Sequence, residues 1–284
     1  MNVEWIGKLA RTGLNGLGRV SPSLAGRLAF HLFCTPFRHA EPPRETAVLR
    51  QAERFSIPFR DIGLAAYAWG EGPTVLLVHG WSGRGPQLGA FVEPLVAAGH
   101  RVVAIDLPAH GRTPGRRTNA QVTTEAVLRV GEAIGPLRGV IAHSFGALNT
   151  TLALRDGLNA ERVVYLAPAC RASQAVRGFA GQIGLSWPVE WGLRSEMERR
   201  FGPNIWPQFS ARVCAPHLSL PALIFHDLED LEVPYREGQL LAHSWPGARL
   251  VVTAGLGHRR ILRDERVIEQ TVEFVRVERM TSAA

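Results

Sequence analysis

The sequence predicts an α/β fold in which helices cover both faces of a mostly parallel sheet. From residue 74 onward, short runs of apolar residues alternate with longer segments of helical periodicity. Strands that are apolar along their whole length are buried on both faces, which is typical of parallel sheets. The chain has 284 residues, 46% of them apolar, so it can fill the core of one large domain that carries an insertion.

The expected elements follow one another in a regular order. Phe55, Ile57 and Phe59 alternate with polar residues before a turn at 61–63, so the sheet should open with an antiparallel hairpin. Parallel strands are then expected at 75–78, 102–105, 140–141, 163–166, 222–225 and 250–252. Helices are expected at 87–98, 120–134, 147–155 and 263–276.

Two segments do not share this alternation, residues 1–50 and residues 169–216. The second concentrates tryptophan and phenylalanine, and it separates the two parts of the core, 51–168 and 217–284. The first should be a helical extension of two short helices. Its second helix should begin at Ser21-Pro22, because serine caps a helix and proline fits the first turn. Glu41-Pro42-Pro43-Arg44 is interpreted as a linker.

Two interpretations of the N-terminal extension stay open. Its apolar residues, Trp5, Ile6 and Leu9 among them, fall at helical spacing among basic residues. Basic amphipathic helices can bind membrane surfaces, so a weak membrane-surface contact is one interpretation. Glycines between 13 and 18 weaken the first helix. This favours the other interpretation, in which the extension packs on the domain or on a partner subunit, and the sequence leaves the oligomeric state open.

Composition argues against several classes of partner. Lys8 is the single lysine among 32 basic residues, and the formal net charge is +7. The arginines are scattered among acidic residues without a block of five or six like charges, so we expect no nucleic-acid partner. Cys34, Cys170 and Cys214 are far apart and lack CxxC spacing, which predicts neither a disulfide framework nor a thiolate metal site.

The sequence shows no membrane-spanning or secretory pattern. No apolar run approaches the roughly 18 residues that a spanning helix needs. The first residues lack the succession of basic start, apolar stretch and cleavage site that marks a signal peptide. These observations predict a cytoplasmic protein.

Ser144 is the strongest candidate for a reactive side chain. It follows the apolar run Val140-Ile141-Ala142-His143 and precedes a helical segment, in the pattern small-x-Ser-x-Gly. A side chain at the tip of a tight strand-to-helix turn needs small neighbours two positions away, so that strand and helix can pass each other. Ala142 and Gly146 meet this demand. A serine that merely caps a buried helix is the alternative.

Four motifs together resemble the α/β-hydrolase fold family, and the resemblance covers residues 74 to about 275. The family's nucleophile elbow is usually Gly-x-Ser-x-Gly, so Ala142 is a departure from it. His79-Gly80-Trp81 resembles the family's His-Gly-x turn, which implies that the backbone N–H groups of Trp81 and Phe145 form an oxyanion hole. His79 itself is then expected to brace the turn. The resemblance also implies that residues 169–216 form a cap.

The family's acid and base are matched after the cap. The strand at 222–225 leads to Asp230 and then Val233-Pro234, so Asp230 is the expected acid, with Asp227 as its rival. Gly257-His258 resembles the turn that brings the base over the serine. The chain order Ser144, Asp230, His258 is the order of this fold. His110 lies in a turn similar to a structural segment of the family, and the other histidines match no motif.

The resemblance implies a serine hydrolase that needs no metal and no organic cofactor. We expect it to cleave an ester or thioester with a small to medium apolar acyl group, bound among Trp81, Trp187, Trp191 and Trp206. Carbon–carbon bond hydrolases and lactonases use similar triads and remain alternatives. A non-catalytic ligand-binding or scaffolding protein of the same fold is a third alternative.

Overall fold

The computed structural model describes residues 3–276, with side chains from residue 11 onward. The expected sites and the sheet all fall within these residues, whereas the side chains of Trp5, Ile6 and Leu9 lie outside the part described. Within residues 3–276 the strands form one sheet in the order β1-β2-β4-β3-β5-β6-β7-β8. The strands are β1 Glu53–Phe59, β2 Ile62–Trp69, β3 Thr74–Val78, β4 Arg101–Ile105, β5 Leu137–His143, β6 Val163–Leu166, β7 Ala222–Asp227 and β8 Ala248–Thr253.

The sheet is mostly parallel, which confirms the predicted fold class. β1 and β2 form the expected antiparallel hairpin, with Phe59 opposite Ile62, and β2 pairs antiparallel with β4. All other neighbours are parallel. Pro58 lies in β1, an edge strand, where a residue without an N–H donor is tolerated.

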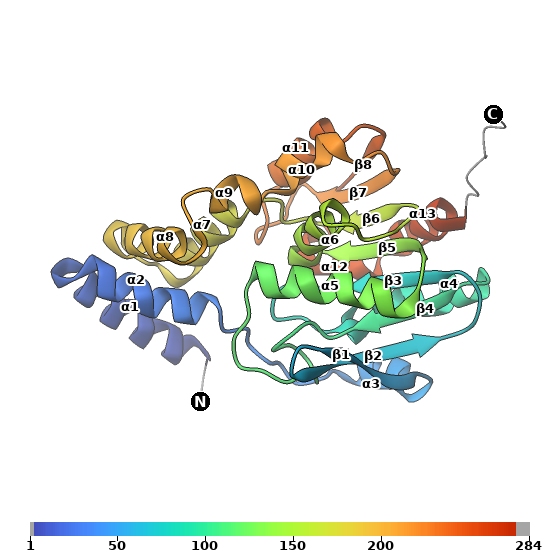
Figure 1. Ribbon diagram of the computed structural model, residues 1–284, viewed down its shortest axis with the longest axis horizontal. Helices are drawn as coiled ribbons and strands as arrows, with labels where there is room; N and C mark the ends of the chain where they lie inside the picture. The colour runs from blue at the N-terminus through green and yellow to red at the C-terminus, as the bar shows by residue number, and fades with distance from the viewer. Residues whose placement is uncertain (1–2, 277–284) are drawn as a thin grey trace.

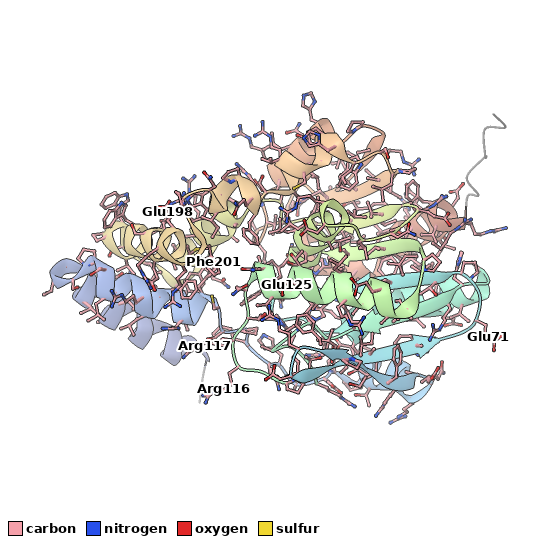
Figure 2. All side chains as sticks on the ribbon, in the orientation of Figure 1. Glu71, Arg116, Arg117, Glu125, Glu198 and Phe201 are labelled. Atoms are coloured by element: carbon pink, nitrogen blue, oxygen red, sulfur yellow. The ribbon has the colours of Figure 1, made fainter. Side chains whose placement is uncertain are left out.

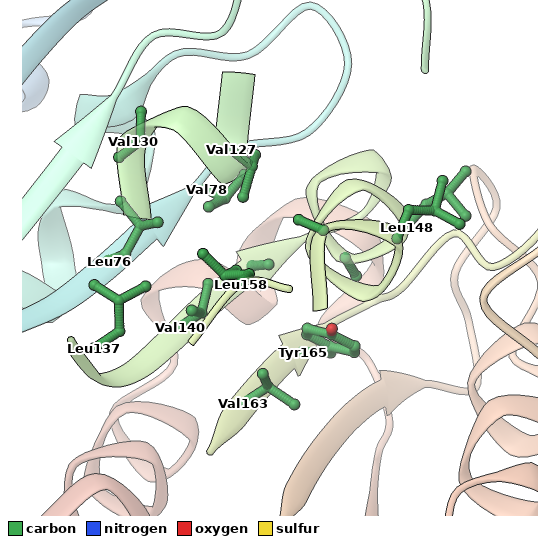
Figure 3. Packing of buried hydrophobic residues seen from close by; sticks show 14 of the residues in the cluster. Leu76, Val78, Val127, Val130, Leu137, Val140, Leu148, Leu158, Val163 and Tyr165 are labelled. Atoms are coloured by element: carbon green, nitrogen blue, oxygen red, sulfur yellow. The ribbon is translucent and has the colours of Figure 1, made fainter. Parts of the chain in front are cut away.

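Helices cover both faces of the sheet (Figure 1). One face packs against α5 Ala120–Ile134, α6 Phe145–Arg155 and α11 Arg236–Ser244. Figure 3 shows Val127, Val130 and Leu148 from two of these helices above the side chains of β3, β5 and β6. The other face packs against α3 Pro43–Arg50, η1 Gly85–Phe91, α4 Val92–Ala97 and α13 Glu265–Arg276. α12 Gly257–Arg260 and η3 Ile261–Arg263 follow β8.

Two details differ from the expected elements. Pro43 begins α3, where a linker was predicted, because a proline fits the first position of a helix whose N–H would have no partner. The helix expected at 87–98 is split into the 3₁₀ helix η1 and the shorter α4. Pro94 lies in the first turn of α4 and cannot donate a hydrogen bond to the preceding turn, which favours an interruption of the helix there.

The insertion between β6 and β7 is helical and packs against the N-terminal extension. It contains α7 Ala172–Ile183, α8 Trp187–Phe201, α9 Ile205–Gln208, α10 Ala211–Cys214 and η2 Ala215–His217. The extension contains α1 Val3–Val20 and α2 Pro22–Phe33, and these lie beside α7 and α8 in Figure 1. Leu14, Phe30, Val189 and Leu193 belong to a separate apolar core that these helices share.

The backbones of α2 and α8 touch where two glycines meet. A Cβ on Gly26 would lie 2.1 Å from the carbonyl carbon of Gly192, and a Cβ on Gly192 would lie 2.1 Å from the oxygen of Pro22. A larger residue at either position would push the helices apart. Between residues 3 and 276, no helix is both long and apolar enough to span a bilayer.

Candidate active site

Ser144 lies at the carboxyl end of β5, where the chain turns sharply into α6. Its backbone has φ 52° and ψ −117°, a conformation that a residue with a Cβ rarely adopts. Its N–H donates to the oxygen of Leu166 at 3.0 Å, and its carbonyl oxygen accepts from Ala169 at 3.1 Å, so the turn is tied to the end of β6. A Cβ on Gly146 would lie 2.6 Å from the carbonyl oxygens of Val78 and His79. A glycine is therefore needed for α6 to pass β3.

Two unused backbone N–H groups lie beside this turn. A Cβ on Gly80 would lie 3.0 Å from the Cβ of Ser144, so the loop after β3 runs directly past the serine. Within residues 3–276 neither the N–H of Trp81 nor that of Phe145 donates a hydrogen bond. The indole of Trp81 meets the ring of Phe145 edge-on, with centroids 5.2 Å apart. The arrangement can offer donors to an oxygen atom near Ser144.

The structure brings His258 and Asp230 into direct contact. His258 Nδ1 lies 2.8 Å from Asp230 Oδ2, and both side chains are buried. The other carboxylate oxygen, Oδ1, accepts hydrogen bonds from the N–H groups of Glu232 and Val233 at 2.9 and 2.8 Å. Burial alone would raise the pKa of Asp230, but hydrogen bonds from His226 and His258 outweigh it and lower that pKa. The acid is therefore ionised at neutral pH.

His258 is also held against the residue that precedes Ser144. The rings of His143 and His258 lie 4.6 Å apart, and His143 Nε2 lies 3.0 Å from the backbone oxygen of His258. Burial, followed by the proximity of His258, lowers the pKa of His143 well below its usual value, so His143 is neutral and donates this hydrogen bond. Among the described residues no hydrogen bond joins the hydroxyl of Ser144 to His258. Catalytic hydrogen bonds of this kind are often long before substrate binds.

Asp227, the rival acid, has a different set of partners. Its Oδ2 accepts from the hydroxyl of Thr253 at 2.7 Å and from the N–H of Leu256 at 3.0 Å, and its Oδ1 accepts from the N–H of Glu229. These bonds hold the loop that leads from β8 to His258. Asp227 thus contacts the loop, whereas Asp230 contacts the imidazole.

His79 joins the ends of β3 and β4. Its Nε2 accepts from the N–H of Leu107 at 3.0 Å, so its Nδ1 carries the proton and donates to the oxygen of Gly80 at 2.7 Å. Burial lowers the pKa of His79 to about 4. Its ring lies 5.0 Å from that of His110, which also contacts Trp81. The two histidines hold the loop that carries the Trp81 N–H.

Aromatic side chains from three parts of the chain meet at Trp81. Phe33, at the end of α2, stacks on the indole with centroids 6.4 Å apart, and Phe179 of α7 meets Phe33 edge-on at 5.2 Å. Phe33 and Phe179 could not be identified from the sequence, because no motif marks them and only tertiary packing brings them to the loop. The N-terminal extension therefore takes part in the surroundings of Ser144.

The segment that follows α2 reinforces this contact. The N–H of Phe37 donates to the hydroxyl of Ser82 at 3.0 Å, and Arg38 donates to the oxygen of Thr113 at 2.7 Å. Arg117, labelled near α2 in Figure 2, donates to His31 Nδ1 at 3.1 Å. The extension is thus fastened to the loop after β3, which carries Trp81, and to the loop after β4.

Three of the tryptophans expected to bind substrate, Trp187, Trp191 and Trp206, contact other residues of the cap. Trp187 and Trp191 are 73% and 51% exposed and stack on each other along the outer face of α8. Trp206 lies under the guanidinium of Arg194 and donates to Glu198, a residue labelled on α8 in Figure 2. Val189, Leu193 and Met197 occupy the buried face of α8, so its tryptophans face outward.

The next question is whether side chains of the described residues could hold a metal ion. Among the described residues no three His, Cys, Asp or Glu side chains gather as a metal would require.

The geometry agrees with a comparison of the chain with known families. The model of the alpha/beta hydrolase family matches residues 75–270. The chain belongs to this family. The match runs from β3 through the cap to α13, and it includes Trp81, Ser144, Asp230 and His258.

Curated relatives within the family match shorter parts of the chain. A pimeloyl-(acyl-carrier protein) methyl ester esterase from Nitrosospira multiformis is 31% identical over 155 residues, which are 52% of this chain and 54% of that protein. Esterases of the same name from Aromatoleum aromaticum and Methylococcus capsulatus match over 22% and 31% of their own lengths. The chain thus spans about half, or less, of the length of the curated relatives it matches.

Solved structures share the fold over most of the chain. A putative lipase from Acinetobacter baumannii AYE superposes with a TM-score of 0.63 at 17% identity, covering 84% of this chain and 97% of that one. An esterase from Exiguobacterium antarcticum gives a TM-score of 0.61 at 15% identity, covering 78% and 99%. At these identities the likeness demonstrates the α/β-hydrolase fold and nothing narrower.

Proposed function

We propose that the protein is a serine hydrolase that cleaves a carboxylic ester or thioester through a covalent acyl-enzyme. One observation carries the proposal: a buried His258–Asp230 pair at 2.8 Å lies against the turn that holds Ser144 at φ 52°. A solvated surface serine needs neither this backbone conformation nor a buried imidazole beside it. Family membership and the ester-hydrolysing relatives support the same class of reaction.

In the proposed reaction Ser144 Oγ attacks the carbonyl carbon of the substrate. His258 Nε2 takes the hydroxyl proton, and ionised Asp230 holds Nδ1–H and stabilises the imidazolium. The N–H groups of Trp81 and Phe145 donate to the oxyanion; one such donor typically contributes about 10²–10³ in rate. The imidazolium then protonates the leaving alcohol or thiol. Water attacks the acyl-enzyme with His258 again as base, which releases the acid and restores Ser144.

The aromatic surroundings of Ser144 support an apolar acyl group of small to medium size. Trp81, Phe145 and Phe33 supply rings at the loop after β3, and Phe179 extends this set toward the cap. Rings of this kind gain free energy from burying alkyl surface, and they offer no partner to a charged acyl chain.

The experiment combines turnover with covalent labelling. Wild-type protein should hydrolyse p-nitrophenyl esters of apolar acids and be labelled by a serine-directed fluorophosphonate. Ser144→Ala should lose both, and Ser219→Ala, at an exposed position, should lose neither. Labelling without ester hydrolysis would favour the carbon–carbon bond hydrolase or lactonase alternative. Absence of both in the wild type would favour a non-catalytic binding protein.

A further inference from the structure

A cavity of about 430 Å³, whose wall does not include Ser144, has arginine at half of its lining positions. It lies where the cap meets α11, and its walls come from α7, α8, α10 and the start of α11. The basic side chains that line it are Arg171, Arg177, Arg194, Arg212 and Arg236. Glu237 is the carboxylate in the same wall.

The charges around this arginine cavity do not balance within the described residues. Glu237 is buried and pairs with both Arg171 Nε and a terminal guanidinium nitrogen of Arg171, so this pair neutralises itself. The guanidinium groups of Arg177, Arg212 and Arg236 make no ion pair or hydrogen bond with any residue between 11 and 276. Arg194 lies over the ring of Trp206 at 4.2 Å and has no carboxylate partner there. Four of the arginines that line the cavity thus have no carboxylate partner among the described residues.

Two helix N-termini add to the positive potential. α7, with 12 residues, and α11, with 9, both begin at the cavity wall. The backbone N–H groups of Ser173 and Arg236 have no acceptor within residues 3–276, and the Ser173 hydroxyl is also without a partner there. Unpaired N–H groups and the helix dipole favour a negative charge at such positions.

The cavity wall is built on the segments that hold the proposed catalytic residues. The segment that leads into α7 is fixed to the elbow by the bond from Ala169 N–H to the Ser144 oxygen. Pro234, in the cavity wall, directly follows Val233, whose N–H donates to Asp230. A ligand in the cavity would therefore contact segments that adjoin both Ser144 and Asp230.

We propose that the arginine cavity binds a phosphate-bearing ligand with at least two negative charges. Planar guanidinium groups match the paired oxygens of phosphate, and several of them can share a multiply charged group. The volume is that of a small-molecule site. The arginines line one hollow and do not form an extended stripe, which separates this site from a nucleic-acid surface. The phosphate can belong to the leaving group of the substrate or to a separate ligand.

Calorimetric titration with sodium pyrophosphate tests the proposal directly. Wild-type protein should bind pyrophosphate saturably. A triple variant R177Q/R212Q/R236Q should bind it about 10- to 100-fold more weakly, because each charged hydrogen bond that is lost raises the dissociation constant. The matched control R50Q/R249Q/R263Q removes the same charge from exposed arginines elsewhere and should bind like the wild type. Far-ultraviolet circular dichroism checks that both variants fold.

Two results would overturn the proposal. One is the absence of saturable pyrophosphate binding by the wild type at millimolar concentration. The other is an equal loss of affinity in the two triple variants, since that would trace binding to net charge and not to the cavity. The pyrophosphate titrations do not depend on turnover, so their outcome is independent of the proposed esterase activity.

A second measurement, which rests on the proposed function, identifies the source of the phosphate. KM is compared for a coenzyme A thioester and for the p-nitrophenyl ester of the same acyl group. If the leaving group supplies the phosphate, the ratio of these KM values rises in R177Q/R212Q/R236Q and not in the control, and pyrophosphate competes with the thioester. If a separate ligand supplies it, pyrophosphate binds but the ratio stays constant.

Discussion

Asp230 and Asp227 show how two carboxylates three positions apart can take different tasks. One carboxylate oxygen of Asp230 accepts hydrogen bonds from Val233 and Glu232, and the other contacts His258. The oxygens of Asp227 accept hydrogen bonds from Thr253, Leu256 and Glu229 instead. The motif around Val233-Pro234 favoured Asp230 from sequence. Spacing along the chain could not exclude Asp227, because the direction of each side chain depends on a loop with no periodic pattern.

This division predicts different outcomes for two amide substitutions. Asp230→Asn should lower kcat by about 10⁴-fold, because the amide no longer holds the imidazole in its productive tautomer. Asp227→Asn should leave the contact between Asp230 and His258 in place and act mainly by weakening the loop at 253–257. Its effect on kcat should therefore be far smaller. Steady-state kinetics on a p-nitrophenyl ester measure both. A larger loss of kcat in Asp227→Asn would reverse the assignment.

Buried neutral histidines predict a loss of stability in acid. Burial, with His79 nearby, lowers the pKa of His110 to about 3, against an ordinary value of 6.5. Below pH 6.5 the His110 imidazole is protonated in the unfolded chain but stays neutral in the folded chain. The free energy of unfolding therefore decreases as the pH falls toward the pKa of the folded state. From pH 7 to pH 4.5 this histidine should cost about 2–3 kcal/mol.

Urea unfolding of the wild type and of His110→Phe at these two pH values measures that cost. The variant cannot take up the proton in either state, so its stability should fall by less than that of the wild type. Comparing each protein with itself removes the effect of the lost hydrogen bond to Pro108. Equal losses in the two proteins would show that His110 is not the source.

At the scale of elements, periodicity predicted the strands and the helices α5, α6 and α13 well. α5 was expected at 120–134 and is found there, and the helix expected at 263–276 begins two residues later. α1 forms despite Gly13, Gly16 and Gly18, because packing of Gly18 on Val189 and of Leu14 in a shared core compensates for weak helix propensity. The same periodicity gave no signal for the Pro43 start of α3.

Alanine substitutions at two helical glycines test whether the close approach of α6 to β3 requires a glycine. Gly146→Ala would place a Cβ 2.6 Å from two carbonyl oxygens of the chain at the end of β3, so it should destabilise the protein by about 1–3 kcal/mol. Gly178→Ala, in α7, meets open space and should stabilise by up to about 1 kcal/mol, since alanine is the better helix former. Chemical denaturation compares them. Similar effects would mean that the close approach at Gly146 is unimportant.

For the whole molecule, the main result that sequence could not supply is how its two non-core segments pack. Residues 1–50 and 169–216 are more than a hundred positions apart. The first segment has the pattern of short amphipathic helices and the second is rich in aromatic residues, and neither pattern identifies the other segment as its partner. In the structure α2 and α8 pack on each other through Gly26 and Gly192, and Phe33 then reaches Trp81. The packing interpretation of the extension thus accounts for its buried residues, Ala25, Ala29 and Phe30.

The contact between α2 and α8 should couple the extension to the proposed active site. Gly192→Ala places a Cβ 2.1 Å from the oxygen of Pro22, which should force α2 away from α8 at a cost of about 1–3 kcal/mol. Because Phe33 ends α2, its stacking on Trp81 should loosen too, so KM for an apolar ester should rise more than kcat falls. Gly181→Ala, on an exposed face of α7 with open space around it, is the matched control and should change neither quantity. Limited proteolysis near residues 34–42 gives an independent readout, since cleavage should accelerate in Gly192→Ala alone. If KM and proteolysis stay at wild-type values in a destabilised Gly192→Ala protein, the extension stabilises the cap without shaping the site.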